Sequence, residues 1–268
     1  MVASWMYSAA ASPNTPVEIL ESLLQFPECR YHLANNPSST PKMLDFLSEP
    51  DAFDSDDEPN SGFSHVLSNL NTTQESMLKI LKHRPELERN LAFNPNCPSQ
   101  VMNRLELSQD PFVLSCLRQN PVTSRKFLAK AVEEIMSLKT WNEVTDYYTM
   151  GKNPSLLVKE MERLTQHPVY QVRDYVAQNK KATPEILKSL VSDENDWVRR
   201  SVSGNPNSTL EILQLLAHDT SRLKPSWGLD TSNNVARFVY HGVMNHPNCS
   251  QELKDFIETL DWKARNLQ

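Results

Sequence analysis

Three side chains near the C-terminal end belong to residue types that bind metal ions. His241, His246 and Cys249 offer two imidazoles and a thiol within one short stretch. A structural zinc site normally has four ligands in closely spaced pairs, and a fourth ligand is missing here. His246 also stands before a proline, where other parts of the chain have an Asn–Pro step. We therefore expect no metal ion and no other cofactor.

The cysteines are the next candidates for chemistry. Cys97 and Cys249 each precede an expected helix start, where other copies of the same pattern have small hydroxyl residues, namely Ser39, Thr123 and Ser208. Cys116 is expected to be a small core residue. With Cys29 they form no CxxC pair, which is typical of reduced thiols in a cytosolic chain and not of a disulfide framework. We expect no redox role for them.

Arginines recur at one position of a repeated pattern. Arg30, Arg173 and Arg199 should line one edge of the fold, about 10 Å apart if each belongs to a neighbouring helix. A row of guanidinium groups can bind phosphates or carboxylates. Alternatively, each arginine pairs with an acid of the adjacent copy, and Asp193, Glu194 and Asp196 are the candidates. The abundance of nearby acids favours structural pairing.

Aromatic residues suggest where a partner would bind. Tyr170 and Trp197 each stand just ahead of a valine pair, so we expect them along one edge, and aromatic anchors are typical of interfaces. Trp227 lies in a polar segment with Pro225 and Gly228 and is expected to be exposed. The predicted partner-binding residues are Tyr170, Arg173, Asp196, Trp197, Arg200 and Trp227.

A catalytic constellation is not apparent. The sequence contains no GxSxG elbow, no HExxH and no glycine-rich phosphate loop, and its Gly151-Lys152 step only precedes an Asn–Pro pair. Five glycines in 268 residues leave few backbone positions for tight anion cradles. We therefore predict a protein that is not an enzyme.

These residues must be positioned by a repeat that runs through the chain. The segments Val198–Leu213, Val172–Leu187 and Cys29–Leu44 share an arginine, a following aliphatic residue, an asparagine and a helix start led by threonine. About nine units of roughly 24 to 26 residues are visible, including a degenerate copy around Asn69-Leu70. The repeated asparagines are Asn36, Asn94, Asn120, Asn153, Asn179 and Asn205.

Each unit is expected to contain two short helices. In one copy Thr183 is placed as an N-cap, Pro184 as the first helical residue, and Ile186, Leu187, Leu190 and Val191 as one apolar face. The second helix, such as Val198–Val202, should end where the Asn–Pro step forces an extended backbone. We predict that the asparagine amide satisfies backbone groups at this turn and forms a ladder along the stack.

Three insertions interrupt the repeats within a single domain predicted over 1–268. Residues 48–62 are acidic and are expected to form an exposed loop. Residues 127–148 favour helix and predict a longer helix or an additional one. Residues 218–234 are expected to form a polar loop.

Composition limits the function classes. The formal net charge of -6 opposes non-specific nucleic-acid binding, because the phosphate backbone rewards concentrated lysine and arginine. Eighteen prolines against five glycines disfavour a βαβ nucleotide-binding fold. The sequence has neither a secretory signal at Met1 nor an apolar run of about 18 residues, so we expect a soluble cytoplasmic protein without a membrane partner.

The repeated pattern V-R-x-x-V-A-x-N-P-x-x-T-P-E-x-L resembles the variant leucine-rich repeat family. This resemblance covers nearly the whole chain and implies an all-α, right-handed solenoid of short α and 3₁₀ helices, similar in shape to HEAT repeats. Some family members carry a cysteine-rich iron–sulfur segment ahead of the repeats. The sequence has no such cysteine cluster, so that property is not expected here.

Solenoid folds commonly serve as binding surfaces. The leading functional hypothesis is a non-catalytic scaffold or adaptor that presents a groove to a protein or peptide, including a subunit that recruits a larger enzyme. The alternative is a HEAT-like nucleic-acid binder or an enzyme of the alkylpurine DNA glycosylase type. Continuous positive potential beside an exposed Trp197 or Trp227 would favour the alternative, whereas an acidic or mixed groove would oppose it.

Overall fold

The computed structural model describes residues 4–53, 59–145, 147–218 and 235–266. These residues are helical throughout, with turns between the helices and no β-strand among them. The chain divides into two compact units, Met1–Ser124 and Arg125–Gln268, whereas the sequence predicted one continuous domain. Each unit is described separately.

The first unit arranges its helices in two layers. One layer, which we call the second-helix layer because it holds the second helix of each copy, runs through α1, α3, α5, the 3₁₀ helix η1 and α8, each in contact with the next. The other, the first-helix layer, contains α2, α4, α6 and α7. The bounds are α1 Ser4–Ala11, α2 Val17–Leu23, α3 Pro27–Asn35, α4 Pro41–Phe46, α5 Pro59–Ser68, α6 Gln74–His83, η1 Pro85–Phe93, α7 Ser99–Leu105 and α8 Pro111–Gln119.

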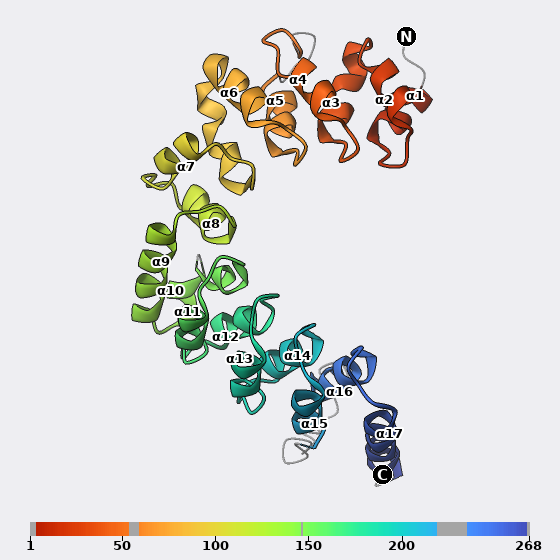
Figure 1. The fold of residues 1–268 in the computed structure, drawn as a ribbon, viewed down its shortest axis with the longest axis vertical. Coiled ribbons are helices and arrows are strands. Elements are labelled where there is room, and N and C mark those ends of the chain that lie inside the picture. Colours follow the sequence, from red (N-terminus) through yellow and green to blue (C-terminus); the bar gives the residue numbers. More distant parts are fainter. Residues whose placement is uncertain (1–3, 54–58, 146, 219–234, 267–268) are drawn as a thin grey trace. The chain divides into compact units, whose positions relative to one another are not determined.

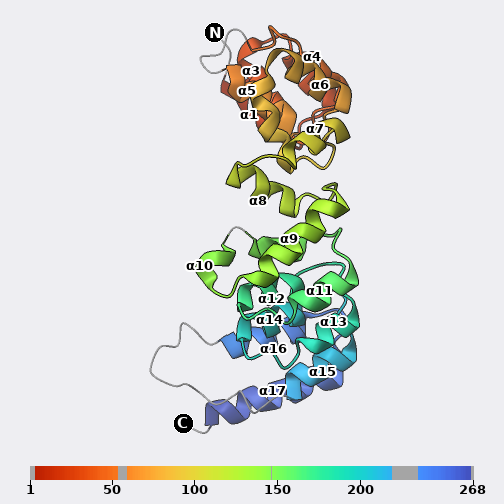
Figure 2. The ribbon, with the colours of Figure 1, turned by 90° about the vertical axis from the view of Figure 1, so that its left-hand side faces the viewer.

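The second unit has the same two layers, which Figure 2 shows from the side. Its second-helix layer runs through the 3₁₀ helix η2, α12, α14 and α16, and its first-helix layer through α9, α11, α13, α15 and α17. The bounds are α9 Arg125–Ser137, α10 Trp141–Val144, η2 Tyr148–Lys152, α11 Val158–Leu164, α12 Tyr170–Ala177, α13 Pro184–Ser189, α14 Asp196–Gly204, α15 Leu210–His218, α16 Val235–Asn245 and α17 Gln251–Asn266.

Local chemistry sets the helix boundaries. Thr183 caps α13, because its side-chain oxygen accepts a hydrogen bond from the backbone N–H of Ile186, and Pro184 follows at the first helical position. At the other boundary, α14 ends at Gly204, and the next residue, Asn205, is extended with φ of -76° and ψ of 127°. The residue before a proline avoids the helical region, so Pro206 stops the helix there.

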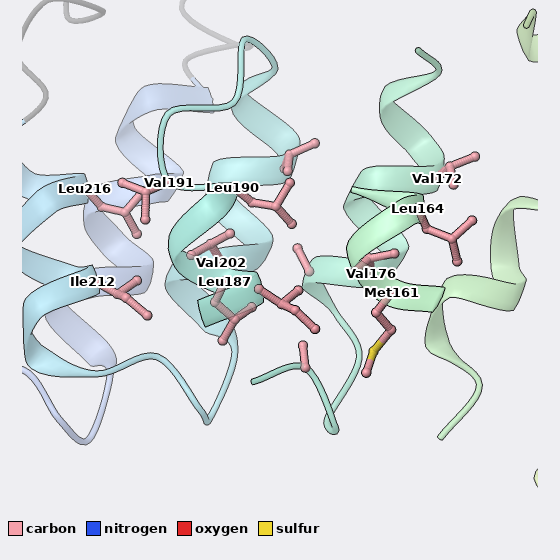
Figure 3. Packing of buried hydrophobic residues seen from close by; sticks show 14 of the residues in the cluster. Met161, Leu164, Val172, Val176, Leu187, Leu190, Val191, Val202, Ile212 and Leu216 are labelled. Carbon is pink, nitrogen blue, oxygen red and sulfur yellow. The ribbon is translucent and has the colours of Figure 1, made fainter. Parts of the chain in front are cut away.

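The core lies between the two layers (Figure 3). In the second unit, Leu187 of α13 and Val176 of α12 are fully buried, as are Val202 of α14 and Leu213 of α15. Helices this short are marginal in isolation, and burying one such aliphatic side chain contributes roughly 1.5–3 kcal/mol. Stacking between successive copies therefore supplies the stability that a single copy lacks.

The insertions differ in how they join this core. Within 48–62, Phe53 is buried with its ring centroid 5.0 Å from that of Phe63, and α5 already begins at Pro59. Glu49, Pro50 and Asp51 are exposed, as expected for a loop, whereas Phe53 anchors one flank to the core. Residues 54–58 lie outside the described residues. Residues 127–148 contain most of α9 and all of α10. Residues 219–234, including Trp227, lie outside the described residues.

In the parts of the chain that the structure describes, no helix has the length and apolarity needed to cross a lipid bilayer.

Candidate interaction groove

The repeated asparagines bind backbone groups of the preceding copy. Asn205 donates from Nδ2 to the carbonyl oxygens of Ala177, at 2.6 Å, and Asn179, at 2.9 Å. Its Oδ1 accepts from the backbone N–H of Asn207 at 2.9 Å. Both ends of this buried amide are therefore bonded.

The same geometry recurs along each unit. Asn179 donates to the carbonyls of Gly151 and Asn153, at 2.7 and 3.0 Å. In the first unit, Asn36, Asn69, Asn94 and Asn120 each donate twice to carbonyls of the preceding copy. Asn153 is likewise buried, and its Oδ1 accepts from the N–H of Ser155. We call these residues the ladder asparagines, and their side chains serve the stacking of copies.

His246 takes the place of a ladder asparagine. Its Nδ1 lies 3.1 Å from the backbone N–H of Asn248, which donates to it. The proton of the neutral ring therefore lies on Nε2, which donates to the carbonyl of Asn205 at 2.9 Å. Both ring nitrogens are engaged with backbone groups, so the His–Pro step performs the structural role of Asn–Pro.

The repeated arginines are also bonded within the fold. Arg173 is buried and forms a bidentate pair with Asp193, at 2.7 and 3.0 Å, and it donates to the carbonyl of His167 at 2.8 Å. Hydrogen bonding to Asp193 raises the pKa of Arg173. Arg199 is buried as well and pairs with Asp196. Arg173 thus pairs with an acid of the following copy, whereas Arg199 pairs with an acid of its own helix.

Arg30 is positioned in the same way in the first unit. It donates to the carbonyls of Leu24 and Ala52, at 3.1 and 3.0 Å, and its guanidinium carbon lies 5.2 Å from the ring centroid of Phe46. Its contacts are thus intramolecular and hold the turn that follows α4.

A groove on the second unit is open to solvent. It lies over the second-helix layer, between η2, α12 and α14. The volume of this groove is about 700 Å³, compared with about 410 Å³ for a second groove over α2 and α4. The lining residues are Lys152, Asp174, Gln178, Lys180, Trp197, Arg200, Ser201, Gly204, Asn205 and Pro206.

A carboxylate joins the two helices beneath the groove. Asp174 of α12 accepts hydrogen bonds from Ser201 Oγ of α14 at 2.5 Å and from Gln178 Nε2 at 2.8 Å. Burial raises the pKa of Asp174, while those two hydrogen bonds and the charges of Lys152 and Arg200 act in the opposite direction. Each carboxylate oxygen thus has a partner inside the protein.

The walls combine aromatic rings with cations. Trp197 is 40% exposed, and the guanidinium carbon of Arg200 lies 5.1 Å from its ring centroid. Lys152 Nζ lies 4.4 Å from the ring centroid of Tyr175. The Tyr175 ring contacts Tyr148 of η2 at a centroid distance of 4.9 Å, and both rings are half-buried. These cation–π contacts hold positive charge beside apolar surface.

Among the predicted partner-binding residues that the structure describes, Trp197 and Arg200 line this groove. Tyr170 is half-buried and packs against the core cluster. Arg173 is buried in its ion pair, and Asp196 is held by Arg199. Trp227 lies outside the described residues. The guanidinium of Arg173 forms hydrogen bonds inside the protein and does not line this groove.

Sequence reasoning missed Lys152, Asp174 and Lys180. The positions next to the ladder asparagines could have identified this groove from the sequence. Lys152, Gln178 and Gly204 directly precede a ladder asparagine, and Lys180 and Pro206 directly follow one. All five line the groove. Because these positions flank a buried residue at the end of each second helix, they come to one surface in successive copies.

The cysteines lie in apolar surroundings. Burial raises the pKa of Cys97 to about 12 and that of Cys116 to about 11. Cys29 is buried too, and Cys249 is half-buried. Since the thiolate is the nucleophile, thiols with such pKa values are chemically inert at neutral pH.

No family model, curated protein or solved structure matches the chain.

Proposed function

We propose that this chain is a non-catalytic scaffold or adaptor protein of the cytoplasm, whose second-helix layer binds a protein or peptide partner. We further propose that the two layers form a right-handed α-solenoid of about nine two-helix repeats, similar to the variant leucine-rich repeat family. The main supporting observation is that different residues of each copy serve stacking and line the groove. Ladder asparagines and paired arginines serve stacking, whereas the groove residues differ from copy to copy.

This separation of roles supports a binding role over a catalytic one. At the position before the ladder asparagine the groove has Lys152, Gln178 and Gly204, which differ in charge and size. Variation at a fixed geometric position gives a surface its specificity without changing the backbone beneath it. Trp197 adds an exposed aromatic side chain, the type that most often anchors a protein interface.

Affinity purification with quantitative mass spectrometry tests the proposal. The wild-type chain should retain a partner at near-stoichiometric level, and Trp197→Ala should reduce its recovery at least about tenfold, as expected for an aromatic anchor. Leu215→Ala is the matched control, because Leu215 is 42% exposed but lies on α15 of the first-helix layer. Equal recovery by the two variants, or no partner at all, would refute the proposed binding face.

A nucleic-acid function is the second candidate, and the cationic and aromatic walls of the groove favour it. Lys152, Lys180 and Arg200 can contact phosphates, and Trp197 can stack on a base. Asp174 beneath them makes the groove mixed in charge and opposes a phosphate backbone. Fluorescence anisotropy with single-stranded and duplex DNA at about 0.15 M salt separates the candidates; saturable binding lost in Trp197→Ala would favour nucleic acid.

A further inference from the structure

We propose that the groove over η2, α12 and α14 recognises an acidic segment of a partner protein, bound as an extended peptide. This inference rests on the proposed function and specifies the chemistry of the partner. The groove is lined by three cations, Lys152, Lys180 and Arg200, and by one carboxylate, Asp174, a formal balance of +2. The chain as a whole carries -6. The groove is therefore positively charged, whereas the protein as a whole is negatively charged.

Some basic residues of the first-helix layer form ion pairs within the fold. On that layer, Lys188 pairs with Glu211 and Arg163 with Glu133. In the described part of the chain, neither Lys152 nor Lys180 has a carboxylate within 4.0 Å. Internal acids therefore leave the ammonium groups of the groove available to carboxylates from outside.

Asp174 cancels one of these three positive charges, which leaves the formal balance of +2. Its two oxygens accept from Ser201 and Gln178, and burial disfavours its ionised form. It therefore ties α12 to α14, and Lys152 and Arg200 line the groove beside it. Arg200, a planar guanidinium, suits bidentate recognition of a carboxylate.

The shape of the groove suits a peptide main chain. A Cβ atom added at Gly204 would meet no atom within 4 Å, so the surface is open at this point of the groove. The Trp197 ring is exposed beside it and offers an apolar contact for a side chain between the acidic residues. Neighbouring packed helices are about 10 Å apart, and an extended peptide advances roughly 10 Å in three residues. Acidic residues at every third position would therefore meet successive helices.

The observations favour an acidic peptide over a nucleic acid. Affinity for a phosphate backbone grows with the number of phosphates that Lys and Arg neutralise, whereas this groove offers three cations around a carboxylate. Gln178 and Ser201 add polar atoms that suit amide groups of a peptide.

Fluorescence anisotropy with defined probes tests the inference. The first probe is a labelled peptide of about nine residues, which spans roughly 30 Å when extended, with Glu at every third position and Leu between. Its Gln and Lys counterparts and a single-stranded oligonucleotide of equal charge complete the set. We expect the Glu peptide to bind at least about tenfold more tightly than the Gln peptide, with a preference that shrinks as salt rises from about 0.05 to 0.5 M.

Substitutions locate the binding site. Lys152→Gln/Lys180→Gln should weaken Glu-peptide binding at least about fivefold, because each exposed ion pair contributes modestly. Lys159→Gln is the matched control, since Lys159 is an exposed lysine of α11 on the first-helix layer. Both lysines of the double variant project from turns or helix ends, and circular dichroism establishes that the variant is folded.

The outcomes separate the inference from the proposed function. Preferential binding of the Gln or Lys peptide, or equal loss in the double variant and the control, would overturn the acidic specificity while leaving a peptide-binding scaffold. Binding of the oligonucleotide alone would overturn both. If no probe binds, the acidic inference is wrong, and affinity purification with Trp197→Ala still decides the proposed function.

Discussion

The asparagine ladder makes a quantitative prediction about stability. Replacing Asn205 by Ala removes two hydrogen bonds donated to Ala177 and Asn179 and one accepted from Asn207. The carbonyl oxygen of Asn179 still accepts a hydrogen bond from the N–H of Ala182 after this substitution. With a net value of about 1 kcal/mol per buried hydrogen bond, the loss is about 2–3 kcal/mol.

Urea unfolding followed by far-UV circular dichroism measures this loss. Repeat arrays can unfold in steps, so the slope with denaturant must be compared between variants before free energies are subtracted. Asn207→Ala is the graded control. Asn207 donates to Lys180 and Ala182 at 2.9 Å from a half-exposed position, and its loss should cost less than about 1 kcal/mol because water can replace the bonds.

A third variant separates the donor from the acceptor. Asn205→Asp keeps the acceptor for the N–H of Asn207 but places a carboxylate against the carbonyls of Ala177 and Asn179. At neutral pH it should be less stable than Asn205→Ala, because a buried anion without donors is costly. If Asn205→Ala costs under about 0.5 kcal/mol, or no more than Asn207→Ala, the ladder does not hold the copies together.

Three further substitutions test the core, the arginine pair and the carboxylate beneath the groove. Leu190→Ala should cost roughly 2–5 kcal/mol in the same unfolding assay, because it truncates a core side chain that is 2% exposed. Arg173→Lys should cost about 2 kcal/mol despite keeping the charge, since an ammonium group cannot reproduce the bidentate contact with Asp193; an unchanged midpoint would contradict this. The pKa of Asp174 in the folded chain lies above its ordinary value of 3.8. Between the unfolded and folded pKa values the folded chain binds more protons than the unfolded chain, so the free energy of unfolding falls as pH rises through this range. Asp174→Asn should therefore gain stability relative to wild type between about pH 3 and pH 7, and a constant difference across that range would exclude this linkage.

The helical architecture followed from short-range signals. Threonine caps, prolines at first helical positions and Asn–Pro stops act within a few residues, so α13 and α14 begin and end close to where the sequence placed them. The two compact units did not follow, because the sequence shows no linker at Ser124 and the division depends on how helices contact one another. The burial of Phe53 was also not predicted, because it depends on a contact with another helix. Acidic neighbours dominate its segment, whereas its burial depends on Phe63 of the next helix.

The candidate site was harder to predict than the fold. Trp197 was noticed because it is an unusual residue in a repeated context, whereas Lys152 and Lys180 are common residues in ordinary surroundings. Their significance depends on convergence, since they come from different copies and meet only when η2, α12 and α14 stack. Arg173 was assigned to the surface for the opposite reason, because its partner Asp193 lies in the next turn and composition alone does not fix which acid reaches it.

Separate residues serve stacking and recognition, and this separation has an energetic consequence. The ladder asparagines are buried and fully bonded, so their substitution should reduce stability in proportion to the bonds lost. Lys152 and Trp197 are exposed, and surface substitutions usually change stability by less than about 0.5 kcal/mol. Groove residues can therefore vary between copies with little effect on folding, provided that the asparagine beside them is kept. The position directly before Asn205 illustrates this freedom, because Gly204 has open space around its Cα while its neighbour bonds three backbone groups.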